Sequence, residues 1–161
     1  MFGLMFRKYD LSMSKETLSE YLENFEAFMA QAKKFDSASV LVVKEEGEWS
    51  PAFVMHHVAD AEMHFALRYF NALTIDSPVI IPFEEDAYPS VLNYEGRDWA
   101  NSLSIIESIG NLVRVSLAPI SSQQWERLSI HPEAGEVTIS FLMGKARNHM
   151  AAHTEQLKSL I

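Results

Sequence analysis

Four long segments of the sequence repeat apolar residues at helical spacing, and this pattern constrains the fold more than any other feature. The segments cover residues 14–35, 50–73, 99–117 and 139–161. Ser50 followed by Pro51 marks the start of the second segment and Thr138 the start of the fourth, because these residue types are favoured at helix N-termini. The pattern predicts an all-α fold, a four-helix bundle with long connecting loops, in which residues 1–161 form a single domain.

Two connections between these segments are predicted to be loops. The first, from Thr74 to Arg97, is about two dozen residues long and contains three prolines. Structureless connections of this length are uncommon and often functional, so we expect this one to cover the site. The second, from Pro119 to Val137, is expected to contain a short helical turn at residues 122–128 and a further turn at residues 130–135, where Pro and Gly occur.

Composition and charge exclude several classes of function. The formal net charge is −9 and the Lys and Arg residues are not clustered, so we expect neither nucleic acid nor an anionic membrane as a partner. There is no cysteine, and the chain therefore has neither disulfides nor a thiol nucleophile of its own. The stretch from Met1 to Leu11 has neither the layout of a signal peptide nor the length of a membrane span, which predicts a cytoplasmic protein.

The fourth segment places two histidines, His149 and His153, on the side that should face the interior. They belong to a stripe with alternating steps of four and three residues: Leu142, Ala146, His149, His153, Gln156 and Leu160. Side chains four residues apart on a helix lie roughly 5–6 Å from each other, so both rings can reach one transition-metal ion at about 2.0–2.1 Å. This spacing also arises by chance, and a third ligand is needed to support a metal site.

The second segment offers that third ligand. His57 lies about 60° from the centre of its apolar line, at 100° per residue, so its ring can point inward. His56 falls a further 100° round the helix and is expected to be a solvated or boundary residue. Three neutral imidazoles leave a divalent ion its full charge and at least one open coordination position, which is typical of a catalytic site.

Several other polar residues near these histidines have two interpretations each. Gln156 either orients a ring or the bound ligand, or is a core amide bonded to backbone. Asp60 either holds a ligand imidazole or is a solvated acid on the helix flank. Arg68 either attracts the carboxylate of a thiol cofactor or is an exposed surface arginine. His64 is expected to be a boundary residue or pocket wall. The acidic run 84–86 is either a solvated loop or a segment that lines a site or binds a cation.

A group of short motifs in this order resembles the DinB/YfiT-like superfamily, over most of the chain. The motifs are Trp49-Ser50-Pro51, His57-Val58-Ala59-Asp60 and His149-x-x-x-His153-x-x-Gln156-Leu157, with Arg68, Ala72-Leu73, the loop from Pro78 to Tyr88 and His131-Pro132 between or beside them. The chain is most similar to the YfiT-like branch. The resemblance implies a four-helix bundle with a divalent metal, nickel or zinc, held by His57, His149 and His153, and it implies a homodimer.

The same resemblance favours one activity among three that the residues leave open. It implies a transferase that activates a low-molecular-weight thiol, such as bacillithiol or mycothiol, at the three-histidine metal site for attack on an electrophilic small-molecule substrate. A hydrolase using a metal-activated water would need the same ligands and a nearby carboxylate base, for which Asp60 and Glu62 are candidates. A bundle without metal, which binds a partner or acts in a stress response without catalysis, can also bury histidines in hydrogen bonds.

Overall fold

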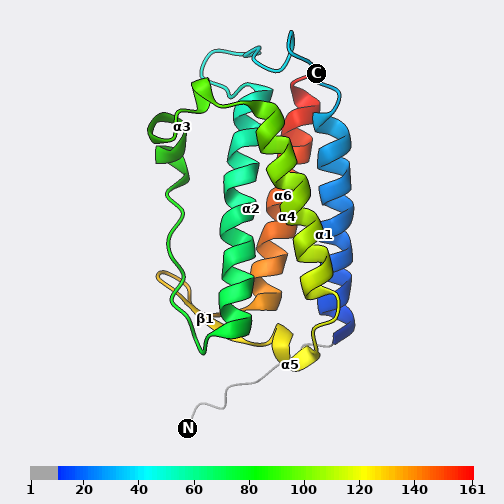
Figure 1. The fold of residues 1–161 in the computed structure, drawn as a ribbon, viewed down its shortest axis with the longest axis vertical. Helices are drawn as coiled ribbons and strands as arrows, with labels where there is room; N and C mark the ends of the chain where they lie inside the picture. Colours follow the sequence, from blue (N-terminus) through cyan, green and yellow to red (C-terminus); the bar gives the residue numbers. More distant parts are fainter. Residues whose placement is uncertain (1–10) are drawn as a thin grey trace.

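The computed structural model describes residues 11–161, and the expectation for the stretch Met1–Asp10 lies outside the described residues. Four long helices form the predicted bundle (Figure 1): α1 Leu11–Ala32, α2 Pro51–Thr74, α4 Trp99–Leu117 and α6 Ile139–Ser159. The shorter elements are η1 Glu85–Ala87, α3 Tyr88–Val91, η2 Tyr94–Gly96, α5 Ser122–Trp125, β1 Leu128–His131 and β2 Gly135–Thr138. Among the described helices, none has the length and apolar content needed to cross a membrane.

Side-chain caps fix where the helices begin. Ser50 Oγ accepts a hydrogen bond from the backbone N–H of Phe53 at the start of α2, and Pro51 occupies the first helical position. Thr138 Oγ1 accepts the N–H of Phe141 in the same way at the start of α6. Both predicted N-termini are therefore confirmed, and with them the helical phase that orients the three histidines.

The helices are arranged in a square in which α1 and α2 occupy opposite corners. Each of these two packs against both α4 and α6. Figure 1 shows that α1 and α6 run in one direction and α2 and α4 in the other, so α2 and α6 are antiparallel neighbours. Because α2 and α4 are parallel, the chain between them must return along the whole length of α2, and this is the reason for the long connection over residues 75–98.

The core extends through the middle of the square and is built from aromatic and aliphatic side chains. Phe25 and Phe28 on α1, Val113 on α4 and Met150 on α6 are almost completely buried within it. Gly110 lets α1 and α4 come close together, because a Cβ atom at this position would lie 2.4 Å from Phe25 Cε2. Gly110 is therefore a point of close helix approach.

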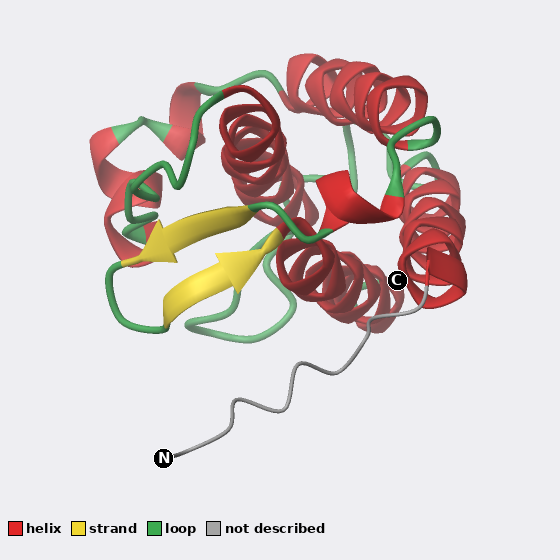
Figure 2. Cartoon of the chain, turned by 90° about the horizontal axis from the view of Figure 1, so that it is seen from below, coloured by secondary structure: helices red, strands yellow, loops and turns green. Residues whose placement is uncertain are grey.

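The connection between α4 and α6 contains a β-hairpin that the sequence analysis did not predict. Strands β1 and β2 pair antiparallel from Leu128 opposite Thr138 to His131 opposite Gly135. The predicted turn is present at the tip of this hairpin, but the strands on either side of it were missed because each is only four residues long. Figures 1 and 2 show the hairpin at the end of the bundle where α2 finishes and α6 begins.

The long connection is attached to the bundle near both of its ends. At the lower end in Figure 1 the backbone N–H of Ile80 donates to the carbonyl of Ile130, and the N–H of Ile130 donates to that of Pro78, each at 2.9 Å. At the upper end, η2 packs against α2. The predicted loop is therefore fastened at both ends along one flank of α2.

Candidate metal centre

The three histidines singled out from the sequence converge in the structure. His57 Nε2 of α2 lies 3.0 Å from His149 Nε2 of α6, and His153 Nε2 lies 3.1 Å from the same nitrogen. All three atoms fall within 4.8 Å of one another. The convergence follows from the fold, because α2 and α6 are antiparallel neighbours and the two histidines of α6 are one helical turn apart on the face towards α2.

Burial keeps these rings neutral. Desolvation, with a smaller contribution from the neighbouring His153, lowers the pKa of His57 from 6.5 to about 4. Desolvation and the charges of His153 and His57 lower the pKa of His149 to about 3. Desolvation also lowers the pKa of His153. Neutral imidazole is the form that binds a metal, so little proton competition remains near neutral pH.

Gln156 sets the tautomer of one ring. His153 Nδ1 lies 2.7 Å from Gln156 Oε1. Because an amide oxygen only accepts hydrogen bonds, His153 carries its proton on Nδ1, and the lone pair on Nε2 points to the other two histidines. The contact predicted between Gln156 and a ring is present.

The donor set fits a divalent transition-metal ion. Four-coordinate binding with metal–nitrogen distances of about 2.0–2.1 Å places ligand nitrogens about 3.3 Å apart, within a few tenths of an ångström of the 3.0 and 3.1 Å observed. The Nδ1 atoms of His57 and His149 are buried without a hydrogen-bond partner in the described part of the chain. Rotation of either ring by a small angle would therefore break no bond that these nitrogens make.

Aromatic side chains surround the histidines on several sides. The Trp49 ring lies 5.1 Å from that of His57, and the Phe83 ring stacks on His57 with centroids 5.9 Å apart. The ring of Phe65, also on α2, lies edge-on to the ring of His149 on α6, with centroids 6.0 Å apart. These rings exclude water from much of the cluster, and they include Phe83 from the long connection, which confirms that this loop covers the site.

The acidic run in that connection comes closer to the site than expected. Glu85 Oε2 lies 3.8 Å from His57 Nε2, although more than half of the glutamate side chain is exposed. Glu85 is therefore exposed, as a solvated loop predicts, and also lines the site, which was the other interpretation of residues 84–86. Its approach depends on the path of a loop fixed by distant contacts, which no local sequence pattern reveals.

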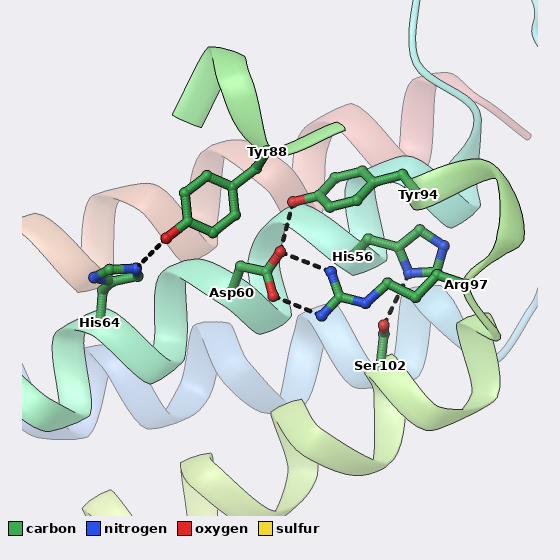
Figure 3. A network of polar contacts seen from close by, with 7 residues as sticks. All are labelled: His56, Asp60, His64, Tyr88, Tyr94, Arg97 and Ser102. Atoms are coloured by element: carbon green, nitrogen blue, oxygen red, sulfur yellow. Dashed lines mark hydrogen bonds and ion pairs between the residues drawn. The ribbon is translucent and has the colours of Figure 1, made fainter. Parts of the chain in front are cut away.

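Asp60 does not contact a ligand imidazole. Its carboxylate is almost fully buried and accepts two hydrogen bonds from Arg97, at 2.6 and 2.7 Å, and a third from Tyr94 Oη at 2.7 Å (Figure 3). Both interpretations of Asp60, as an imidazole partner and as a solvated acid, are wrong. The carboxylate instead binds α2 to the end of the long connection, and the residues that bind it are 34 and 37 positions away in the chain.

His56 and His64 also take part in contacts across this flank of α2 (Figure 3). The prediction of His56 as a solvated or boundary residue is wrong, because its ring is completely buried and its Nδ1 lies 2.8 Å from Ser102 Oγ on α4. The beginning of α2 is buried on almost every side, so a helix-face argument failed there. His64 is half-buried, and its Nε2 lies 2.7 Å from Tyr88 Oη of α3.

Glu62, a candidate for the base of a hydrolase in the sequence, is instead buried in the bundle core. Glu62 is only 1% exposed, and its Oε2 accepts a hydrogen bond from Tyr21 Oη of α1 at 2.5 Å. Desolvation raises the pKa of Glu62 from 4.5 to about 7, against a smaller opposing effect of the Tyr21 hydrogen bond. A glutamate at a core position of a helix is a signal that the sequence carries, but its partner is 41 residues away.

Comparison with known proteins places the chain in a family. The sequence model of the DinB superfamily matches residues 15–157. A Bacillus subtilis protein, YfiT, provisionally named a metal-dependent hydrolase, is 26% identical over 153 residues, with 89% of this chain and 86% of the relative covered. An Oceanobacillus iheyensis protein with the same provisional description is 32% identical over 114 residues, which cover 71% of this chain and 66% of the relative.

Two solved structures share the fold. The structure of Bacillus subtilis YfiT has a TM-score of 0.79 at 20% identity, covering 98% of this chain and 92% of that one. A mycothiol-dependent maleylpyruvate isomerase has a TM-score of 0.75 at 17% identity, covering 95% of this chain and 63% of the longer protein. At these identities the likeness concerns the fold, and it confirms the four-helix bundle.

Proposed function

The chain belongs to the DinB superfamily, and from that membership and its three-histidine cluster we propose that it is a metal-dependent enzyme. The observation that carries the proposal is the convergence of three Nε2 atoms, from one buried and two half-buried histidines, whose pKa values are lowered by desolvation. His57, His149 and His153 would hold the ion. Nickel and zinc both suit imidazole ligands, so the ligand set is compatible with either.

The reaction we propose is the transfer of a low-molecular-weight thiol to an electrophile. A divalent ion here would supply the positive charge that favours the thiolate form of a bound thiol. The chain has no cysteine, so the sulfur must come from a second molecule, of the bacillithiol or mycothiol kind. Support comes from the mycothiol dependence of the isomerase that shares the fold. Phe83 and Trp49 would exclude water from the ligand rings.

Hydrolysis is a second candidate, favoured by Glu85. A hydrolase needs a carboxylate or similar base that takes a proton from the attacking water, and Glu85 Oε2 lies 3.8 Å from His57 Nε2. The provisional names of the curated relatives point in the same direction. The two activities differ in whether an added thiol is required, and in whether Glu85→Gln abolishes turnover.

The test begins with metal content. Protein purified without a histidine tag is expected to contain about one nickel or zinc ion per chain by elemental analysis, and His149→Ala is expected to lose it. His131→Ala is the matched control, because His131 lies on the hairpin outside the cluster and accepts hydrogen bonds from the backbone N–H groups of Glu133 and Ala134. Metal retained by His149→Ala at the wild-type level would disprove the proposed centre.

Activity then separates the candidates. Conjugation of bacillithiol to 1-chloro-2,4-dinitrobenzene that requires the ion supports the transferase, whereas metal-dependent cleavage of p-nitrophenyl acetate without thiol supports the hydrolase. Absence of both activities in metal-loaded protein would favour the non-catalytic bundle. Homodimer formation stays a prediction, which light scattering of the purified protein measures directly.

A further inference from the structure

A cavity of about 400 Å³ lies between α2, α6 and the hairpin, further down the bundle than the histidines. Its walls include Phe65, Arg68, His131, Glu133, Phe141 and Lys145. One of these, Phe65, contacts the His149 ring, and Lys145 precedes His149 by one helical turn, about 6 Å along α6. The cavity therefore begins beside the candidate metal centre and extends away from it.

Two cations in the cavity are arranged in the same way, one from each helix. The Arg68 guanidinium of α2 lies over the Phe65 ring at 5.5 Å, and Lys145 Nζ of α6 lies over the Phe141 ring at 5.5 Å. Each pair presents a positive charge next to an apolar face. Together they form a surface that suits a ligand with a hydrophobic body and a negative end.

Arg68 differs from the other arginines of the described region, because it has no carboxylate partner there. The four others each form an ion pair: Arg97 with Asp60, Arg114 with Glu26, Arg127 with Asp76 and Arg147 with Glu20. Arg68 is half-buried, its Nε has no hydrogen-bond partner among residues 11–161, and its Nη2 makes only a long bond of 3.4 Å to the Ile81 carbonyl. Most of the N–H donors of its guanidinium are therefore available to a ligand.

A second cavity of about 370 Å³ leads from Arg68 back to the histidines. It shares Arg68, His131 and Glu133 with the first cavity, and its wall also includes Phe83 and Glu85, which both contact His57. Acidic side chains are present on these walls, yet in the described part of the chain none lies within 4.0 Å of the Arg68 guanidinium. Arg68 therefore lines both the cavity of about 400 Å³ and the cavity of about 370 Å³.

We propose that this region binds a carboxylate-bearing small molecule with an aromatic or aliphatic body. The carboxylate lies between Arg68 and Lys145, the apolar body rests on Phe65 and Phe141, and the opposite end of the molecule points to the histidine cluster. The orientation rests on the proposed function, since it makes the cluster the reacting centre. Binding of the carboxylate itself requires no metal ion.

The test uses metal-free protein, prepared with a chelator, and two probes that share an apolar body but end in a carboxylate or in a neutral alcohol. Calorimetry is expected to show that 4-phenylbutyrate binds at least tenfold more tightly than 4-phenylbutanol, and that Arg68→Gln and Lys145→Gln each remove most of that preference. Lys158→Gln is the matched control, because Lys158 lies on the same helix, exposed and paired with Glu155, away from the cavity. It is expected to bind both probes as the wild type does.

The proposal would be overturned by equal affinity for the two probes or by no detectable binding of 4-phenylbutyrate. It would also be overturned if Arg68→Gln and Lys145→Gln both kept the wild-type preference for the carboxylate. Lys145 is exposed, so Lys145→Gln tests it even if Arg68→Gln lowers the stability of the fold. Metal content is measured on separate samples. A protein that binds 4-phenylbutyrate but no metal would disprove the metal-dependent function and support the anion site. A protein that binds metal but not 4-phenylbutyrate would disprove the anion site and leave the metal-dependent function supported.

Discussion

Replacement of the buried Glu62 by glutamine is expected to change how the stability of the bundle depends on pH. In the folded protein the pKa of Glu62 is raised to about 7, because its carboxyl group is 1% exposed and no cation in the described region pairs with it. In the unfolded chain the group has an ordinary pKa near 4.5. Between these two values the folded state holds a proton that the unfolded chain has already released.

The sign and size of the effect follow from this difference. The free energy of unfolding falls as pH rises from 4.5 to about 7, because the unfolded chain binds fewer protons than the folded one. At about 1.4 kcal/mol for each pH unit, the loss amounts to about 3 kcal/mol. Glutamine resembles the protonated form in shape and stays neutral, so Glu62→Gln is expected to lack this loss.

Urea denaturation at several pH values between 4.5 and 8 measures the difference between the two proteins. Buried histidines make the opposite contribution: the pKa values of His56 and His57 are lowered to about 4 by burial, so stability due to them falls as pH falls below 6.5. Both proteins contain these histidines, and their effect cancels in the difference. A stability difference between Glu62→Gln and the wild type that is constant from pH 4.5 to 8 would refute the reasoning.

Two further substitutions test the packing and the loop attachment. Gly110→Ala is expected to lower the free energy of unfolding by about 1–3 kcal/mol, because its Cβ would overlap the Phe25 ring. Gly144→Ala is the control, since nothing lies within 4 Å of its Cβ, and in thermal melts it is expected to be neutral or stabilising by up to about 1 kcal/mol. Arg97→Met leaves Asp60 buried without a cation and is expected to cost about 3 kcal/mol in urea denaturation. An unchanged midpoint would show that the ion pair contributes nothing.

The helices and the three converging histidines could be predicted because their signals are local. Capping residues and apolar spacing determine the start and the buried face of each helix, and helical phase alone places His149 and His153 together. The third residue, His57, needed only the further assumption that α2 faces α6. Each of these inferences depends on residues within a few turns of one another.

The contacts that the sequence did not reveal join residues far apart in the chain. Asp60 and Arg97 meet only because a long connection returns along α2, and the same path brings Glu85 to His57. His56 was misplaced for a different reason. A helical-face argument assumes one solvent-facing side, and the first half of α2, packed against α4, α6 and η2, has almost none.

The location of the three histidines on two helices also bears on the unfolded chain. His57 and His149 are separated by 92 positions, so an ion held by both closes a loop of that length. Cross-links of such loops reduce the conformational entropy of the unfolded ensemble by an amount equivalent to roughly 4–5 kcal/mol at 25 °C. A cation at this centre would therefore act as a reversible counterpart of a disulfide, in a chain that has no cysteine with which to form one.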